Sequence, residues 1–560
     1  MSFQIPKTLP HFNTLLYPDL LAVEMNDIDV DRMMSTLLEM FFKNGRSLKS
    51  NTKPLEYDVY LEQFLALPTI DGLDQQRRKE VINGWLRAAV IVMGKAGLDR
   101  AVPKMDYLKP ISAGVFRAGL PRGSSRNRKA DVLIYRSLVQ AATSRAEETS
   151  DNKFRFLSAL VERALCDGLD IPRVKEQDPK YNGHSQIDLS AILALEFIQE
   201  FPNRGAMTKR LEGLDTSASG DDVALGAVLG AVDPIGLDVL SLLEHYGGAL
   251  STPELVEHLT SVISFRLFQL PLRVAFATRS LLETGELDVE WGGGDIKNPL
   301  SIFCDFTREV GSISDDLSRR CVQRDLDRMR QFLSDRLVLR TLDRQVMPML
   351  RDNAELRVLT VAERLRTLVQ RMEDDEVEQA IHMNIQAIEY QLKESDDGSD
   401  GIALIDSVRE AKLRAVDQIG QVLFEGLRKR GLENQVKWFW NAGGITKADG
   451  LLKGTLKART TWRYAPSDHM LISILMVAFA DQAGRKMSAM PIAELLIKLE
   501  RSFGILIDKP PPEFENASTR AAAARNRDAF VMKLQLLGCF EGLSDDFSAQ
   551  MVRRPREVAS

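Results

Sequence analysis

Residues 436–469 read VKWFWNAGGITKADGLLKGTLKARTTWRYAPSDH, and the rest of the chain is organised around this stretch. It holds three of the chain's five tryptophans, six lysines and arginines, and only two acids. Such a composition is typical of single-stranded nucleic-acid binding, because bases stack on aromatic rings while cations meet phosphates. Large aromatics beside a helix end also pack in cores, and we favour that interpretation for Trp438 and Trp440.

The cations of the same stretch are better candidates for contact with an anion. Lysine and arginine neutralise nucleic-acid phosphates regardless of base sequence. An ordinary solvated surface is the alternative, since charged runs are common on proteins of every kind. The candidate nucleic-acid-binding residues here are Lys453, Lys457, Arg459 and Arg463.

Length and composition predict a globular protein of several domains. At 560 residues the chain is too long for one core, and roughly 150 residues per domain gives about three or four domains. Apolar residues make up 44% and charged residues 27%, which excludes disorder and collagen-like structure. The formal charge of -6 is mild, so an anionic partner must meet a local patch.

The cysteines indicate a reducing compartment. Cys166, Cys304, Cys321 and Cys539 stand singly, with neither a Cys-x-x-Cys nor a neighbouring histidine, so we expect no disulfide framework and no zinc site. The first residues lack the basic and apolar regions of a secretory signal. The apolar window 471–480 is about half the ~20 residues that a membrane span needs. We therefore expect a cytoplasmic protein without a membrane partner.

Apolar residues recur at helical spacing along most of the chain, so we predict a mainly α fold, a multi-domain helical scaffold with a C-terminal winged-helix-like module. The segment 217–311 has two interpretations, a winged helix with a small hairpin or a helical repeat. The expected divisions are an N-terminal helical domain (1–216), a short-helix domain (217–311), a long-helix, coiled-coil-like segment (312–435), a basic aromatic glycine-rich connector (436–466) and the C-terminal domain (467–560).

The C-terminal domain shows the order of a winged helix. Helical patterns at 470–483, 490–503 and 525–537 precede a predicted hairpin with a polar turn at 544–546. In such a domain the third helix can enter the major groove while the wing touches the DNA backbone. The same fold also docks proteins. The candidate DNA-contacting residues are Arg520, Arg525, Arg527 and Lys533 on or before the third helix, and Arg553 and Arg554 beyond the wing.

Two weaker patterns remain. A basic glycine- and serine-rich loop at 122–129 either binds phosphate or is a solvated connection. The acids Asp288, Glu290 and Asp295, with Lys297, surround a triple glycine in the order of a metal-dependent nuclease. The Glu-Ala-Lys at 410–412 lies in a helical pattern and is discarded. Phosphate-loop, nucleophile-elbow and His-Glu-x-x-His motifs are absent from the sequence, so we assign no catalytic residue, metal ligand or cofactor.

Three segments of the last quarter of the chain resemble a known group of proteins. KWFWNAGG at 437–444, WRYAPSD at 462–468 and LGCFEGLSDD at 537–546 are similar to accessory proteins of bacterial anti-phage islands, notably the methylation-associated defence system. The resemblance implies a multi-protein system that distinguishes self from foreign DNA. It also implies other defence proteins as partners, which would supply methyltransferase, ATPase or nuclease chemistry.

These observations favour a non-enzymatic DNA-binding or scaffold subunit of a prokaryotic defence complex. Two alternatives stay open at this stage. One is a helical interaction protein that binds no nucleic acid. The other is a divergent metal-dependent nuclease that uses Asp288, Glu290, Asp295 and Lys297.

Overall fold

The fold was analysed in a computed structural model of the chain. Several expectations from the sequence lie outside the residues that the structure describes, among them the boundary between 216 and 217, the acids around the triple glycine and the polar turn at 544–546. The structure describes residues 3–7, 9, 12–42, 57–66, 75–94, 104–109, 127–145, 150–166, 168–170, 180–183, 191–193, 226, 228–287, 298–350, 359–395, 398–480, 487–541 and 550–556.

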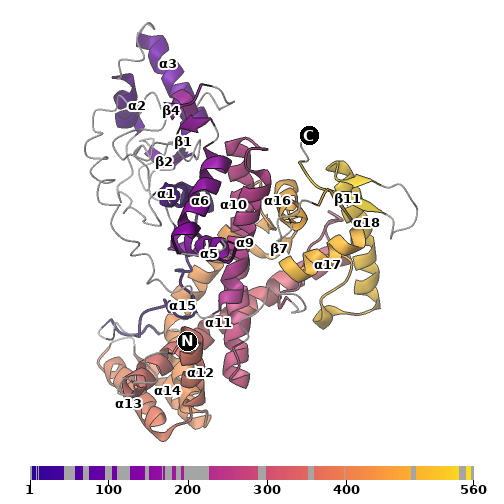
Figure 1. Cartoon of the computed structure of the whole chain (residues 1–560). Coiled ribbons are helices and arrows are strands. Elements are labelled where there is room, and N and C mark those ends of the chain that lie inside the picture. The colour runs from indigo at the N-terminus through magenta and orange to yellow at the C-terminus, as the bar shows by residue number, and fades with distance from the viewer. Residues whose placement is uncertain are drawn as a thin grey trace.

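The described residues are mainly helical, which confirms the mainly α part of the predicted fold class (Figure 1). The N-terminal elements are α1 (Val30–Phe42), α2 (Tyr57–Leu65), α3 (Gln75–Trp85), the π-helix η2 (Leu86–Val90), β1 (Ile91–Gly94), β2 (Lys104–Leu108), α5 (Ala130–Arg145), α6 (Ser150–Leu165), β3 (Leu169–Asp170) and β4 (Lys180–Tyr181). The middle elements are α9 (Leu229–Tyr246), α10 (Thr252–Thr284), β5 (Ile302–Phe303), α11 (Ile313–Leu350), α12 (Val361–Gln370), α13 (Asp375–Lys393), α14 (Ser399–Glu410) and α15 (Ala415–Ala442). The C-terminal elements are β6 (Leu452–Thr455), β7 (Ala458–Tyr464), α16 (Asp468–Phe479), β8 (Ala489–Pro491), α17 (Ile492–Phe503), β9 (Ile505–Leu506), the 3-10 helix η4 (Pro512–Phe514), α18 (Ala517–Leu536), β10 (Phe540–Glu541) and β11 (Met551–Arg553).

Helix α10 lies at the centre of the molecule. It contacts α9, α11, α15 and α16, and α1 from the N-terminal part. By length and composition it could cross a membrane, but 94% of its most apolar window is buried inside the protein, as in the core helix of a globular fold. The expectation of a run of short helices at 217–311 is therefore wrong for α10, which runs for 33 residues. A helix buried on every side has no polar face, so its sequence shows weak helical periodicity.

Pro271 interrupts the hydrogen bonding of α10, and a tryptophan from another helix repairs it. Proline has no backbone N–H, so the carbonyl of Leu267, four residues earlier, loses its helical partner. The indole Nε1 of Trp438 in α15 donates to that carbonyl at 2.9 Å. Trp438 is completely buried, so the bond lies out of water. The interpretation of Trp438 as a buried packing residue is confirmed, and its indole N–H also donates a buried hydrogen bond.

Polar side chains along α10 donate hydrogen bonds to backbone carbonyls at the carboxyl end of α17. Arg266 Nη1 donates to the carbonyl of Ser502 at 3.0 Å, and Gln269 Nε2 donates to that of Phe503 at 2.5 Å. Arg273 is also fully buried, and burial lowers its pKa to about 9. Cations are favoured at a helix carboxyl end, where backbone carbonyls lack partners. These contacts fix the C-terminal elements to the centre of the molecule.

The expected connector at 436–466 is largely regular structure. Residues 436–442 are the last turns of α15, which crosses the predicted boundary at 435/436, and β6 and β7 form a hairpin. Buried apolar residues from all five predicted segments belong to one hydrophobic core. The division into five domains stays a prediction.

The long-helix segment predicted at 312–435 contains α11, α12, α13, α14 and most of α15. Helix α11 runs from Ile313 to Leu350. Thr360 caps α12 through a reciprocal pair with Glu363. Figure 1 shows α12, α13 and α14 gathered at one end of the molecule, away from the C-terminal elements.

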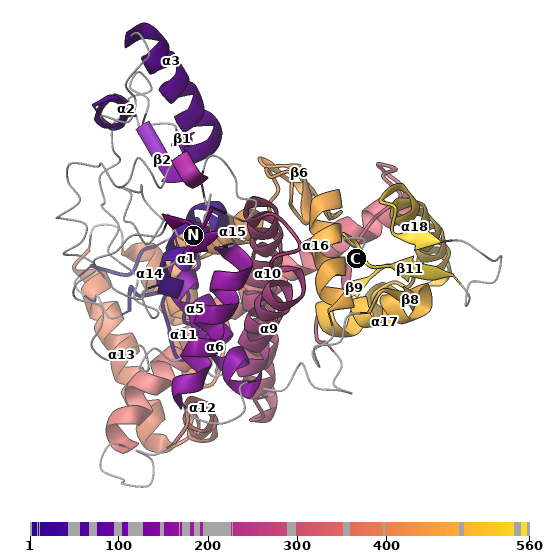
Figure 2. The ribbon, with the colours of Figure 1, turned by 45° about the horizontal axis from the view of Figure 1, so that its top comes forward.

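The C-terminal elements surround a small antiparallel sheet of order β10-β11-β8 (Figure 2). Helix α17 ends at Gly504, whose φ of 64° suits glycine, as expected from the sequence. The parallel pairing of Ile302 in β5 with Ile505 in β9 ties this region to the loop before α11. Asn526 of α18 strengthens the tie, because its Nδ2 donates to the carbonyls of Cys304 and Ile507, each at 2.9 Å.

The repair of the α10 break is testable by combining two substitutions. Trp438→Phe leaves the carbonyl of Leu267 buried without a donor, at a cost of about 1–3 kcal/mol in the free energy of unfolding. Pro271→Ala restores a backbone N–H to that carbonyl. We expect Pro271→Ala to raise the stability of the Trp438→Phe variant by more than it raises that of the natural chain, in urea denaturation.

Trp440→Phe is the matched control, since Trp440 is only half-buried and the same indole atoms are lost from the end of α15. The gain from Pro271→Ala in the Trp440→Phe background should equal that in the natural chain. Strict additivity of Pro271→Ala and Trp438→Phe would contradict the proposed role of the indole.

Candidate functional site

The β6–β7 hairpin displays two cations side by side. Lys453 pairs with Arg463 across the hairpin, next to the pair of Leu452 with Tyr464. Side chains alternate between the two faces of a strand, and Tyr464 is buried, so Lys453 and Arg463 share the other face. Like charges directly opposite one another destabilise a hairpin unless an acid lies nearby.

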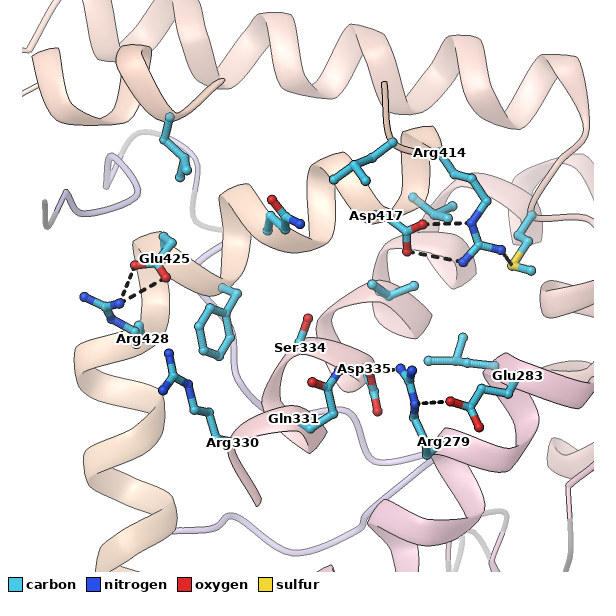
Figure 3. Close-up of a pocket in the computed structure, with 18 of the residues that line it drawn as sticks. Arg279, Glu283, Arg330, Gln331, Ser334, Asp335, Arg414, Asp417, Glu425 and Arg428 are labelled. Carbon is cyan, nitrogen blue, oxygen red and sulfur yellow. Dashed lines mark hydrogen bonds and ion pairs between the residues drawn. The ribbon is translucent and has the colours of Figure 1, made fainter. Parts of the chain in front are cut away.

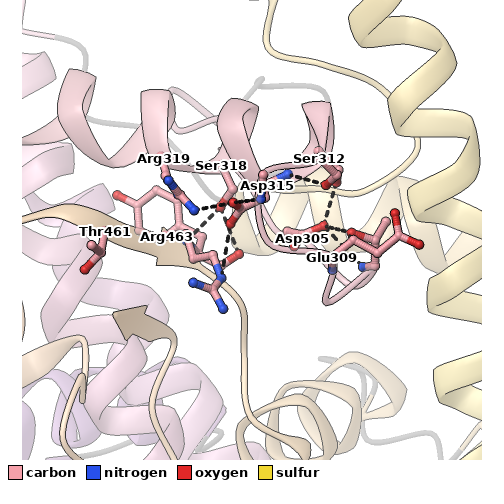
Figure 4. A network of polar contacts seen from close by, with 12 residues as sticks. Asp305, Glu309, Ser312, Asp315, Ser318, Arg319, Thr461 and Arg463 are labelled. Atoms are coloured by element: carbon pink, nitrogen blue, oxygen red, sulfur yellow. Dashed lines mark hydrogen bonds and ion pairs between the residues drawn. The ribbon is translucent and has the colours of Figure 1, made fainter. Parts of the chain in front are cut away.

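Asp315, in the first turn of α11, is that acid (Figure 4). Its Oδ1 lies 3.3 Å from Nε of Arg463, and its Oδ2 accepts hydrogen bonds from the Gly311 amide, at 2.8 Å, and from Arg319. The carboxylate is almost fully buried. Because one carboxylate faces two guanidinium groups, one positive charge remains uncompensated here.

The loop that leads into α11 is folded around Asp305. Its Oδ1 accepts hydrogen bonds from Thr307 Oγ1 at 2.7 Å and from Ser314 Oγ at 2.6 Å. Arg308, which directly follows Thr307, has a φ of 59°, which non-glycine residues rarely adopt. The bonds to Asp305 hold this conformation, and Nη2 of Arg308 lies 3.4 Å from Oδ1 of Asp468.

Between this loop, the hairpin, the start of α16 and α18 lies a pocket of about 590 Å³. Asp468 is a carboxylate in its wall, and it pairs with both Arg308 and Lys533. Lys533 is itself almost buried, on the inner side of α18. The cationic and titratable basic side chains that line the pocket are Arg308, Lys453, Arg463, His469 and Lys533.

A stacked histidine pair lies behind the pocket. The rings of His258, on α10, and His469 are parallel within 5°, with centroids 4.5 Å apart. Ser473 Oγ donates to the carbonyl of His469, so the 2.8 Å contact between Ser473 Oγ and His258 Nδ1 must have the histidine as donor. Burial, together with the nearby charges of His469 and Arg556, lowers the pKa of His258 to about 3. His258 is therefore neutral at physiological pH.

The hairpin and the pocket fall within the part of the chain that matches a known family. Residues 12–556 match the family described as methylation-associated defense system protein MAD7. The chain belongs to this family. No significant match was found among curated proteins or among solved structures. The match extends the resemblance seen in the last quarter of the sequence to almost the whole chain.

The structure brings together three of the ten candidate residues of this MAD7-family chain in the pocket, Lys453, Arg463 and Lys533. Two more, Lys457 and Arg459, are exposed at the tip of the same hairpin. These five residues come from β6, the turn, β7 and α18. The sequence pattern at 436–469 had pointed to four of them.

The remaining five candidates do not share one surface. Arg520 lies 3.7 Å from Glu515, and Arg527 pairs with Asp528 at 3.0 Å. Arg554 donates to Tyr246 Oη at 2.9 Å, and its guanidinium group lies over the Tyr246 ring. These contacts give Arg554 a structural role. Arg525 and Arg553 are exposed. At about 100° per residue, Arg525 faces away from Arg520 and Arg527 on α18, so these cations do not form one face.

The other sequence patterns of this MAD7-family chain lie mostly outside the residues that the structure describes. Within the described residues, no group of three or more His, Cys, Asp or Glu side chains could hold a metal ion. The acids Asp288, Glu290 and Asp295 lie outside those residues, as does most of the basic loop at 122–129. At the end of that loop, Arg128 pairs with Asp27, which gives it a structural explanation.

A larger cavity, of about 980 Å³, lies between α10, α11 and α15 (Figure 3). Its charges pair with one another: Arg279 with Glu283 at 2.7 Å, Arg414 with Asp417 at 2.7 Å, and Arg428 with Glu425 at 2.9 Å. Acids outnumber the four arginines of its lining. This cavity is therefore unsuited to an anion, in contrast to the smaller pocket.

Sequence reasoning missed the acids and the arginine that complete the pocket. Arg308 and Asp315 precede the hairpin by more than 130 residues, and no local pattern links them to it. Asp468 was recognised only as a residue near a helix start. Ser467 is the cap, because its hydroxyl accepts from the Met470 amide at 3.1 Å, and Asp468 is thereby free to face Lys533.

The neutral, buried His258 predicts how stability depends on pH. Between pH about 6.5 and 3 the unfolded chain binds a proton at His258 that the folded chain rejects. This site therefore lowers the free energy of unfolding by up to ~1.4 kcal/mol for each pH unit below about 6.5. In His258→Asn, whose amide can still donate to Ser473, denaturation between pH 7 and 5 should show a correspondingly smaller loss. An unchanged slope would contradict the assignment.

Proposed function

We propose that this MAD7-family chain is a non-enzymatic DNA-binding or scaffold subunit of an anti-phage defence complex in the bacterial cytoplasm. Membership of a methylation-associated defense system family supports a role in anti-phage defence and supports other defence proteins as partners. The proposal adds that this subunit binds DNA directly. Partner proteins would supply the chemistry that modifies or cuts the DNA.

The observation that carries the proposal is the basic hairpin beside the cationic pocket. Lys457 and Arg459 project into solvent at its tip, where a phosphate can reach them without first breaking an ion pair with another described residue. Exposed cations of this kind supply sequence-independent affinity for DNA, because they release counterions from the phosphates. Contacts to phosphate orient a protein on a duplex but read no sequence.

The winged-helix-like module is part of the proposal, and two features support it. Apart from β9 and η4, which are inserted between α17 and α18, the order α16, β8, α17, α18, β10, β11 is that of a winged helix. The central place of β11 in its sheet also fits such a module. In such modules the third helix, here α18, approaches the major groove. With Arg520 and Arg527 beside acids, Arg525 is the best candidate on α18 for a DNA contact.

One observation favours the alternative, a protein-interaction subunit. Met532 and Leu536 lie on the same side of α18 as Arg525 and are 64% and 79% exposed. Large apolar side chains exposed at helical spacing are typical of surfaces that dock proteins. The two functions are compatible if the hairpin contacts DNA and α18 contacts a partner protein.

The hairpin proposal is tested by a salt-titrated gel shift with duplex and single-stranded DNA. We expect binding that weakens steeply with salt. Replacing Lys457 and Arg459 with Gln should weaken binding and lower the slope of log K against log[salt] by roughly 0.9 for each lost contact to duplex phosphate, and by about 0.7 for single strands.

Lys412→Gln is the matched control, since Lys412 is an exposed lysine just after α14. Figure 1 shows α14 at the lower end of the molecule, well away from β7. It should leave the affinity and the slope unchanged. Equal losses in the hairpin and control variants would mean that the net charge of the protein matters and the hairpin does not. No binding by the natural chain would favour the interaction subunit without nucleic acid.

A further inference from the structure

The pocket beside the hairpin carries more positive charge than its acids can neutralise. Each of two carboxylates is shared between two cations: Asp315 between Arg319 and Arg463, and Asp468 between Arg308 and Lys533. Lys453 faces the pocket as a further cation. Among the side chains that line the pocket, four formal positive charges (Arg308, Lys453, Arg463 and Lys533) meet two carboxylates (Asp305 and Asp468). The pocket therefore has an excess of about two positive charges before His469 is considered.

Asp468 occupies the position where an anion would be held. Lys533, from α18, and Arg308, from the loop before α11, reach the same oxygen, Oδ1, from different parts of the chain. The Asp468 side chain is 53% exposed, so it can turn away towards water. Lys533 is 10% exposed and depends on an anion in the pocket for its partner. Asp468 is thus an internal anion that a stronger one can replace.

We propose that this pocket binds a phosphate monoester, as carried by a nucleotide or by the 5′ end of a DNA strand. A phosphomonoester carries between about 1.5 and 2 negative charges near pH 7 and has three strong acceptor oxygens. That charge matches the pocket's excess, whereas a backbone diester carries only one. The volume of about 590 Å³ lies in the usual range for small-molecule sites.

The bound phosphate would take the place of the Asp468 carboxylate. Lys533 and Arg308 would then donate to phosphate oxygens, and Lys453 would gain a partner. Arg463 would stay with Asp315, which is too deeply buried to leave. Binding is non-covalent, and it requires only that the Asp468 side chain rotates outwards.

The test is calorimetric titration of the full chain with inorganic phosphate, AMP and adenosine, and with 5′-phosphorylated and 5′-hydroxyl oligonucleotides, at constant ionic strength. Phosphate and AMP should bind saturably and adenosine should not. A phosphorylated oligonucleotide that binds more tightly than its hydroxyl twin identifies a DNA end as the ligand. A preference for AMP identifies a free nucleotide.

Two variants and one control locate the site. Lys453→Gln should weaken phosphate binding roughly tenfold, the loss of one charge-assisted hydrogen bond. Asp468→Asn should tighten phosphate binding several-fold, because the competing carboxylate is gone, even if the substitution lowers the melting temperature of the protein. If Asp468 had only a structural role, the same substitution would weaken phosphate binding. Lys457→Gln, on the same hairpin but outside the pocket, should leave phosphate binding unchanged.

Absence of saturable phosphate binding, or equal losses in Lys453→Gln and Lys457→Gln, would overturn the proposal. So would equal affinity for AMP and adenosine. The inference is independent of contact between the hairpin and the DNA backbone, because Lys457→Gln affects only the latter. Loss of DNA affinity in Lys457→Gln with intact phosphate binding would leave the pocket proposal standing.

Discussion

The fold depends on burying α10 on all sides. A long helix in a core must leave no backbone group without a partner, and Pro271 creates one such group at Leu267. Trp438 meets it from α15, so two segments separated by about 170 residues are fixed in register by one hydrogen bond. Arg266 and Gln269, on the same helix, hold the end of α17. The centre of the protein therefore determines where both the hairpin after α15 and the C-terminal elements lie.

The positions of the cations follow from that arrangement. The hairpin follows the end of α15 and lies against α11, where Asp315 reduces the electrostatic repulsion between Lys453 and Arg463. The docked C-terminal elements bring α18 to the other side, and Asn526 fixes its register so that Lys533 faces Asp468. Four segments thus converge on one pocket whose carboxylates are shared. The cations of the hairpin form a pocket with residues from the other segments only because the core holds these segments together.

Local patterns predicted the fold class and much of its detail. Apolar spacing predicted the long helices and the end of α17, and the aromatic stretch pointed to Trp438 and to the hairpin cations. Three features could not be foreseen. The continuity of α10 was hidden, because a fully buried helix lacks amphipathic periodicity and Pro271 reads as a break. The hairpin at 452–464 was not predicted within the connector at 436–466, since glycines and interspersed cations are also typical of linkers. The partners Arg308 and Asp315 depend on tertiary contacts that no local spacing encodes.

The central claim is that the core-held hairpin and pocket form the surface that meets nucleic acid. Hydrogen–deuterium exchange of the full chain with and without DNA tests it most directly. The account predicts slower exchange in 452–464 and in the loop 305–312 when DNA is added, with no change in α12, α13 and α14. Protection confined to those three helices, or to the exposed face of α18, would contradict it.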